Sequence, residues 1–168
     1  MRFGTHAQGN LGFRKFLFEI GLPTMYARTA YRVRTELPGD ESRIDVEVAC
    51  PREFLLHIEC KIWSGEGEDQ TSREWTDMQR RSRELGIPKG KREHCVHGLL
   101  LTLDGTGPKD NRFQPITWRQ VARVFDSFGR DAEPQDVKVF SYHMATTLRG
   151  ILPETTITEE YEDGEQPA

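Results

Sequence analysis

The sequence lacks the features that mark several large classes of protein. None of its apolar runs approaches the roughly 20 residues needed to cross a bilayer, and a mixed polar stretch follows Arg2 where a signal peptide would be apolar. Its three cysteines are an odd number without framework spacing, so we expect reduced thiols and a cytoplasmic location. The phosphate loop G-x-x-x-x-G-K and internal repeats are also missing, which argues against ATP use and against a repeat architecture.

The composition that remains is that of a folded, soluble domain. Of the 168 residues, 36% are hydrophobic and 30% are charged, and this length suits a single domain with its own core. We expect that domain to cover residues 1–153 and to be followed by a flexible acidic tail over 154–168. The tail accounts for the formal net charge of -4, because it holds acidic residues but no lysine or arginine.

Positive charge is clustered in two segments of the chain. Residues 1–35 carry several arginines and a lysine against Glu19 alone, and residues 80–92 carry a second basic group against Glu84 alone. Clusters of this kind suit a polyanionic partner, although ordinary solvated surfaces have them too. The candidate phosphate contacts are Arg80, Arg81, Arg83, Lys89, Lys91 and Arg92.

Hydrophobic periodicity predicts the element order α-β-β-β-α-β-α-α. A helix between the third and fourth strands makes those two strands parallel, so the fold class is α/β, with a central mixed sheet of four strands or slightly more flanked by helices. The helix around residues 69–85 has only a thin apolar stripe, so we expect most of it to face solvent or a ligand. The predicted elements are a helix that Asn10 caps and that runs to Gly21, strands over 31–37, 44–48 and 54–63, a helix over 69–85, a buried strand over 95–103 that includes Cys95, a loop over 104–115, a helix over 117–128 that begins with a capping box at Thr117, and a helix over 137–151.

Acidic and basic side chains share one face of two neighbouring strands. Because side chains alternate along a strand, Asp45 and Glu47 point to one side of the second strand, while His57, Glu59 and Lys61 point to one side of the third. Converging carboxylates raise each other's pKa unless a cation neutralises them. Mg²⁺, or Mn²⁺ in its place, would do so and could activate water against a phosphodiester, with the lysine orienting that water.

The string Glu-x-Lys alone is weak support for this site. With 27 acidic residues in the chain, roughly one such match arises by chance. A second match, Asp136-Val137-Lys138, opens a predicted helix and has no acidic strand before it. The match at Glu59 and Lys61 instead lies in an apolar strand, where two charges are costly without a function.

Several short motifs resemble the PD-(D/E)XK nuclease superfamily. The runs 42–48 (SRIDVEV) and 56–62 (LHIECKI) are similar to its core motif, and 68–70 (EDQ) resembles the start of the next helix in one branch. The runs 101–103 (LTL) and 115–118 (PITW) are similar to later motifs of that branch. The resemblance covers roughly residues 10–128 and implies a restriction-endonuclease-like fold, with an αβββαβ core followed by C-terminal helices.

The resemblance also implies an activity and roles for particular residues. It implies a Mg²⁺-dependent DNA endonuclease of bacterial or phage defence, restriction or repair, with DNA ahead of RNA as partner; a homodimer or a larger multi-protein system stays open. Two positions depart from the pattern: Ile44 replaces the proline, and Glu74 stands where the branch often has tyrosine. The implied roles are metal ligands at Asp45, Glu59 and the Cys60 carbonyl, with Glu19 as an additional acid, a catalytic lysine at Lys61, and a positioning glutamine at Gln70.

Other interpretations of the same residues remain open. A catalytically inactive module of the same fold could bind nucleic acid or a protein, and Glu59 with Lys61 could form a plain cross-strand ion pair. We expect Glu47 to lie behind the ligands or to face solvent. The histidines near Cys95 do not supply the four spaced ligands of a structural zinc site. Trp75 is expected to pack in the core in preference to stacking on a base.

Overall fold

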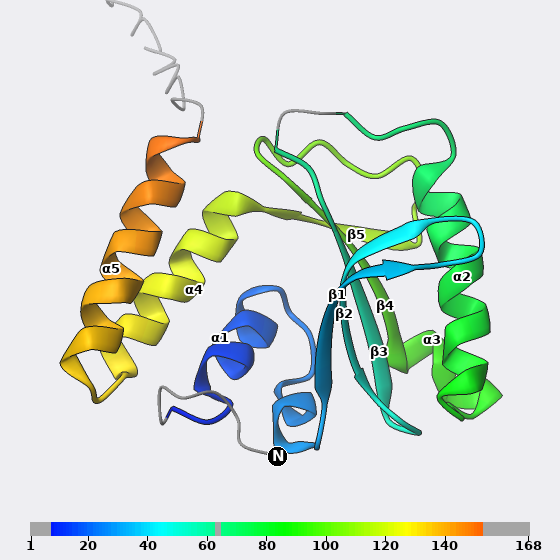
Figure 1. Ribbon diagram of the computed structural model, residues 1–168, viewed down its shortest axis with the longest axis horizontal. Coiled ribbons are helices and arrows are strands. Elements are labelled where there is room, and N and C mark those ends of the chain that lie inside the picture. The colour runs from blue at the N-terminus through cyan, green and yellow to red at the C-terminus, as the bar shows by residue number, and fades with distance from the viewer. Residues whose placement is uncertain (1–7, 63–64, 153–168) are drawn as a thin grey trace, which may run out of the picture.

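A five-stranded mixed sheet forms the centre of the molecule (Figure 1). The structure, a computed structural model, describes residues 8–62 and 65–152, so the predicted acidic tail lies outside the described residues. The first three strands form an antiparallel meander, and the third, fourth and fifth run parallel. In sheet order the strands are β1 (Arg32–Pro38), β2 (Arg43–Cys50), β3 (Phe54–Cys60), β4 (Val96–Thr102) and β5 (Phe113–Thr117).

Helices flank this sheet, as the sequence predicts for a mixed α/β protein. No described helix is long and apolar enough to cross a membrane. The predicted element order is confirmed, with β5 and three short helical segments added to it. The helices are α1 (Leu11–Glu19), η1 (Thr24–Arg28), α2 (Gln70–Glu84), η2 (Lys89–Lys91), α3 (Arg92–Cys95), α4 (Trp118–Asp131) and α5 (Gln135–Gly150).

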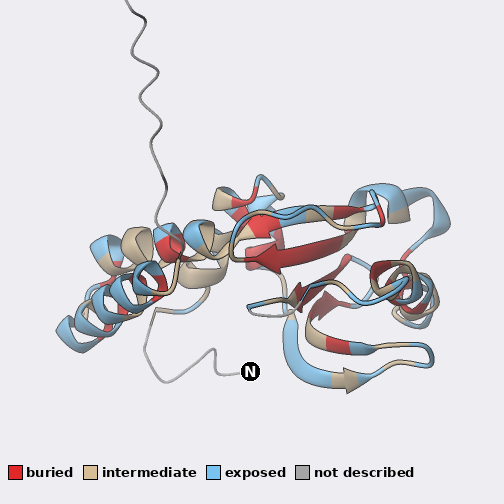
Figure 2. Ribbon diagram, turned by 90° about the horizontal axis from the view of Figure 1, so that it is seen from above, coloured by how far each residue is buried: buried red, intermediate tan, exposed pale blue. Residues whose placement is uncertain are grey.

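The alternation of side chains along β3 divides the core into two layers. Leu56 and Ile58 pack in one cluster with Leu17 of α1, whereas Leu55 packs in the other with Met78 of α2. Helices α1 and α2 therefore cover opposite faces of the sheet (Figure 1). Buried residues concentrate in the central strands between them (Figure 2).

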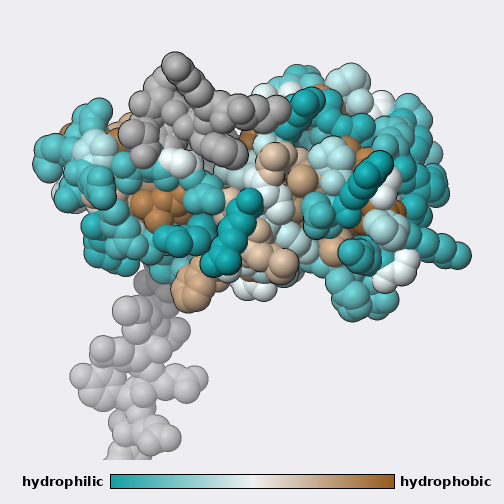
Figure 3. Space-filling model, turned by 90° about the horizontal axis from the view of Figure 1, so that it is seen from below, coloured by the Kyte–Doolittle hydropathy of each residue, from teal (hydrophilic) through white to brown (hydrophobic). Residues whose placement is uncertain are grey.

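Helices α4 and α5 pack on each other on the α1 side of the sheet. A complete capping box at Thr117 begins α4, as predicted: the hydroxyl of Thr117 accepts from the Gln120 backbone, and the Gln120 side chain accepts from the Thr117 backbone. The outer side of α5 exposes Phe140 and Tyr142. The face shown in Figure 3 is largely hydrophilic, with apolar side chains in small patches.

Four local predictions are wrong in detail. Strand β5 occupies residues predicted as loop and helix start; its Pro115 is tolerated because β5 is an edge strand. Strand β3 ends at Cys60, before the predicted end at Trp63, which lies outside the described residues. The Asn10 side chain does not cap α1 and instead donates to the Ala27 carbonyl. Cys95 ends α3 and is half-buried, so it is not a buried strand residue.

Helix α2 differs most from its prediction. Its weak apolar stripe predicted a helix that mainly faces solvent, yet α2 packs on the sheet through polar side chains. Thr71, Glu74, Asp77 and Ser82 are all buried, between 0 and 2% exposed. A hydrophobicity pattern cannot register such a face, because its members are polar and find their partners on distant strands.

Candidate active site

Side chains four residues apart on α2 lie against side chains two residues apart on β3. Gln70 donates from Nε2 to Glu59 Oε1 at 2.5 Å, and Glu74 Oε1 lies 3.6 Å from His57 Nδ1. Four helical residues advance by about 6 Å and two strand residues by about 6.6 Å. The two elements therefore stay in register, and α2 presents its polar side chains to the strand that carries the predicted catalytic residues.

The predicted core of the site meets at this end of β2 and β3. Lys61 Nζ lies 2.8 Å from Glu59 Oε1, the same oxygen that Gln70 contacts. One strand away, Asp45 Oδ2 accepts from the backbone N–H of Cys60 at 2.8 Å. In a regular strand the N–H and C=O of one residue point to the same side, so we expect the Cys60 carbonyl on the Asp45 side. The structure thus brings together the residues that the sequence analysis singled out on β2, β3 and α2.

The carboxylates of this group outnumber Lys61, the lysine that contacts Glu59. Burial raises the pKa of Glu59, the hydrogen bond from Lys61 lowers it, and the charges of Asp45 and Glu74 raise it again, so that it lies above its ordinary value. Burial and the neighbouring carboxylates raise the pKa of the Cys60 thiol to about 12. A cation would therefore be favoured at this position.

Three buried carboxylate oxygens at the site accept no hydrogen bond within the described part of the chain. They are Oε2 of Glu59 and both oxygens of Glu74. A buried unpaired carboxylate is costly, and a bound cation is one way to compensate it. The donor chemistry fits Mg²⁺, which prefers oxygen ligands.

The number of donors also fits a magnesium ion that keeps several waters. In residues 8–62 and 65–152 no group of three or more His, Cys, Asp or Glu side chains could hold a metal ion. The predicted set comprises the carboxylates of Asp45 and Glu59 with the Cys60 carbonyl. Mg²⁺ is ordinarily bound by one or two carboxylates together with water, so this set is sufficient for it.

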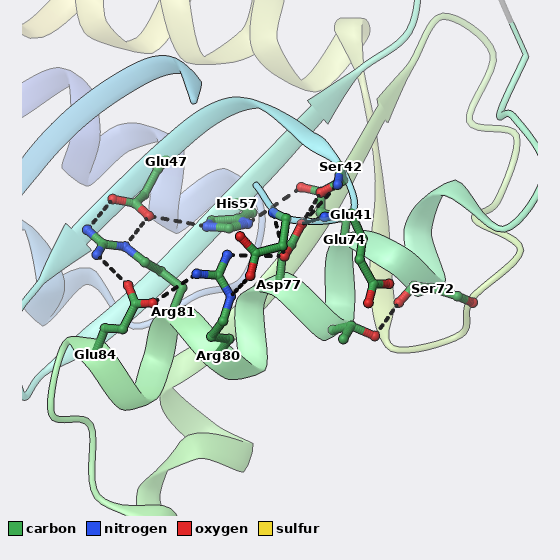
Figure 4. A network of polar contacts seen from close by, with 12 residues as sticks. Glu41, Ser42, Glu47, His57, Ser72, Glu74, Asp77, Arg80, Arg81 and Glu84 are labelled. Atoms are coloured by element: carbon green, nitrogen blue, oxygen red, sulfur yellow. Dashed lines mark hydrogen bonds and ion pairs between the residues drawn. The ribbon is translucent and has the colours of Figure 1, made fainter. Parts of the chain in front are cut away.

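Glu47 is the anchor of a second, well-paired group beside the site (Figure 4). It is 1% exposed and contacts Arg81 through Nε and Nη2 at 2.9 and 3.2 Å, and Arg34 at 2.7 Å. Burial raises the pKa of Glu47, but His57 and the two arginines lower it to about 2. Glu47 does lie behind the predicted ligands, but it is an ion-paired buried residue and does not face solvent.

His57 lies between the two groups, fully buried. Its Nε2 is 3.4 Å from Glu47 Oε2, and its Nδ1 faces Glu74 (Figure 4). Burial opposes protonation, yet Glu47 and Glu74 together raise the pKa of His57 above its ordinary value. The imidazole thus links the ion-paired group to the carboxylates at the candidate metal site.

Asp77 and Arg80 fix α2 to the turn between β1 and β2. Asp77, which is 2% exposed, accepts hydrogen bonds from the backbone N–H groups of Asp40, Glu41 and Ser42, and from the Ser42 hydroxyl. Arg80 adds ion pairs to Asp77 and Asp40. The hairpin that carries Asp45 is therefore held directly by the helix that carries Gln70.

Three of the six predicted phosphate-binding residues have partners within the protein. Arg81 is engaged by Glu47 and Glu84, and Arg80 by Asp40, Asp77 and Glu84, so these guanidiniums hold the protein's own carboxylates. Arg92 donates from Nε to the carbonyl of Ile87. The exposed members of the set are Arg83, Lys89 and Lys91.

Glu19 does not join the site. It ends α1 on the opposite face of the sheet, where it pairs with Arg123 of α4 at 2.7 Å. The prediction of an additional metal ligand at Glu19 is therefore wrong in this structure, because α1 and α2 lie on different sides of the sheet. The sequence could not decide this, since it does not show which face α1 covers.

A cavity of about 320 Å³ opens beside Lys61. Its walls include Lys61, Thr102 and Asp104, which lie at or just beyond the carboxyl ends of the parallel strands β3 and β4. Ligands of open α/β sheets commonly bind at this end of the strands. Lys61 contacts both the cavity and Glu59, so it lies between the buried carboxylates and the solvent.

The residues considered for base stacking or zinc binding make contacts within the fold or stay free. Trp75 packs edge-on against Phe113, with ring centres 6.3 Å apart, and Arg112 lies over its ring at 5.0 Å. All three cysteines are free. His97 lies 3.2 Å from the hydroxyl of Tyr26, which also donates to the carbonyl of His94.

No protein-family model, curated protein or solved structure matches this chain. The site is therefore characterised by its own geometry: Asp45, Glu59 and Lys61 lie close together, and the buried carboxylate oxygens beside them accept no hydrogen bond within the described residues.

Proposed function

We propose that the protein is a metal-dependent nuclease of the PD-(D/E)XK type that hydrolyses phosphodiester bonds, with DNA as the preferred substrate. One observation carries the proposal: Lys61 contacts Glu59, and Asp45 is fixed to the backbone of Cys60 between them, at one end of two paired strands. Mg²⁺ is the expected cofactor, with Mn²⁺ as a substitute.

The role proposed for each residue of the site follows from its contacts. Asp45 and Glu59, with the Cys60 carbonyl, would hold the cation. When bound, Mg²⁺ supplies the charge that polarises the phosphodiester and lowers the pKa of an attacking water. Lys61 lines the cavity, so its ammonium group can orient that water or stabilise the negative charge that develops on phosphate. Gln70 holds Glu59 in place through its amide.

The exposed basic residues would hold the nucleic-acid backbone. Arg83, Lys89 and Lys91 lie at the end of α2 and in the segment that follows it. Contacts of this type release counterions, so binding should weaken as salt rises, with a slope that falls by about one for each phosphate contact removed. Arg81 should not contribute to that slope, because it is held by Glu47.

The direct test is cleavage of plasmid and linear DNA, and of RNA, with Mg²⁺ or Mn²⁺ and with or without chelator. Asp45→Ala and Lys61→Ala should each lower the rate by about 100-fold or more. The chance motif on α5 provides matched controls, since Asp136→Ala and Lys138→Ala remove the same residue types far from the site and should cut like wild type. Failure of the wild type to cut any substrate, or full activity of Lys61→Ala, rejects the proposal.

A non-catalytic module of the same fold is the second candidate. The observation that favours it is the closure of the site, since Glu59 is only 3% exposed beneath α2. Manganese titration separates the two functions. A nuclease site binds Mn²⁺ saturably and loses that binding in Asp45→Ala and Glu59→Ala, whereas an inactive module shows no such dependence.

A further inference from the structure

We infer that Glu74 supplies a third carboxylate to the metal site, and that it acts through water bound to the cation. This inference rests on the proposed function, because it concerns the same cation. Its starting point is the burial of Glu74, which is 0% exposed while neither of its carboxylate oxygens accepts a hydrogen bond within the described residues.

The register between α2 and β3 places Glu74 next to the predicted ligands. Glu74 lies one helical turn after Gln70, and Gln70 already contacts Glu59. Glu74 Oε1 lies 3.6 Å from Nδ1 of His57, which precedes Glu59 by two residues on the same strand. Oε2 of Glu59 is likewise buried without a donor. Carboxylate oxygens that accept no hydrogen bond within the described residues thus come both from β3, at Glu59, and from α2, at Glu74.

His57 does not complete the pairing of Glu74. Its Nδ1 lies 3.6 Å from Glu74 Oε1, beyond hydrogen-bonding distance. The other ring nitrogen faces Glu47, which Arg34 and Arg81 already pair. His57 thus lies between two carboxylates, and Glu74 is the one that no arginine pairs within the described residues (Figure 4).

The number of donors argues for an indirect contact. No described group of three carboxylate, thiol or imidazole side chains could hold a metal ion, which favours a contact through water over direct ligation by Glu74. Mg²⁺ keeps several of its waters, and those waters donate hydrogen bonds. The oxygens of Glu74 would accept them. Groups that act on a metal in this way typically change its affinity by about 10- to 100-fold when they are replaced.

The test is calorimetric titration of MnCl₂ into the full-length chain. Four proteins are compared: wild type, Glu74→Gln, Glu84→Gln and Asp45→Ala. Glu84 makes the matched control, because it undergoes the same chemical change on the same helix while its side chain is surface-exposed and paired with arginines. We expect Glu74→Gln to weaken Mn²⁺ binding by about 10- to 100-fold and Glu84→Gln to bind as wild type does.

The variants distinguish failure of this inference from failure of the proposed function. If Glu74→Gln binds Mn²⁺ like wild type while Asp45→Ala does not bind, the metal site stands and the role of Glu74 is rejected. If Glu74→Gln abolishes binding as completely as Asp45→Ala, the indirect contact is rejected in favour of direct ligation. If wild type binds no Mn²⁺, both proposals fall. Should Glu74→Gln not fold, as judged by circular dichroism, the same criteria apply to Glu74→Asp.

Discussion

Replacing Arg81 by methionine removes the main partner of a buried carboxylate while keeping a long, flexible side chain on α2. Glu47 is 1% exposed, and Arg81 contacts both of its oxygens, at 2.9 and 3.2 Å. Lowering the pKa of Glu47 from its ordinary value of 4.5 to about 2 corresponds to about 3 kcal/mol in favour of the charged form. Removing one partner of a buried ion pair costs about 3–5 kcal/mol.

The expected loss lies at or below the lower end of that range. Arg34 and His57 still contact Glu47 in the variant, so we expect Arg81→Met to lower the free energy of unfolding by about 2–3 kcal/mol. For a chain of 168 residues this corresponds to a melting temperature lower by about 5–10 °C. The measurements are urea denaturation and a thermal melt at pH 7. Arg83→Met is the control, because Arg83 is an exposed neighbour on the same helix, and it should change stability by less than about 0.5 kcal/mol.

The pH dependence of the stability difference between wild type and Arg81→Met is the most stringent test of this ion pair. A carboxylate whose pKa is lowered in the folded state stabilises the protein above the pKa of the unfolded state, and this stabilisation is lost as pH falls through the folded-state pKa. For Glu47 that window runs from 4.5 down to about 2. The difference between wild type and Arg81→Met should therefore be constant above about pH 5 and shrink below pH 4.5. If the two proteins are equally stable at pH 7, or if their difference in stability does not shrink in acid, the Glu47–Arg81 ion pair does not stabilise the protein as argued.

Three further substitutions test other contacts of the same framework. Asp77→Ala removes the acceptor for the β1–β2 turn, including the hydroxyl of Ser42, and should lower the free energy of unfolding in urea by about 2–3 kcal/mol; an unchanged urea midpoint would mean that the turn holds itself. Gly98→Ala places a methyl group 2.8 Å from the Phe113 ring and should cost about 1–3 kcal/mol in a thermal melt, a loss that Phe113→Leu should partly restore if the clash is its cause. Thr117→Ala removes the capping box of α4 and should cost about 1 kcal/mol by chemical denaturation, whereas Thr117→Ser should keep most of it, and an equal loss in both would speak against the cap.

Sequence patterns predicted the elements whose periodicity is strong and local. The meander of three strands, the crossover helix and the fourth strand follow from alternation and from Gly and Pro at the ends of the elements. Strand β5 was missed because its five residues include Pro115 and offer little alternation. The faces covered by α1 and α2 could not be assigned, because either helix can pack on either side of a sheet until the tertiary contacts are known.

At the site, the sequence identified the residues on the strands and Gln70 on the helix, and it missed the other residues that support them. Asp45, Glu59 and Lys61 could be found because alternation fixes their face. The importance of His57, Glu74 and Arg81 depends on the register between α2 and the strands, which no local pattern contains. One signal was present in the sequence: a helix with a weak apolar stripe followed two charged strands, which is what a helix with a polar buried face looks like.

The distribution of paired and unpaired charges along α2 is itself an argument for function. At one end Arg81 and Glu47 form an ion pair, and along the helix Asp77 accepts four hydrogen bonds from the β1–β2 turn. Between these anchors and Gln70 lies Glu74, buried and without a hydrogen bond within the described residues. A helix that only needed to cover the sheet could place an apolar side chain there, as it does at Met78, and would avoid the cost of a buried carboxylate that accepts no hydrogen bond. Departures from local stability rules concentrate where function requires them, and this one lies beside the residues proposed to hold the metal ion.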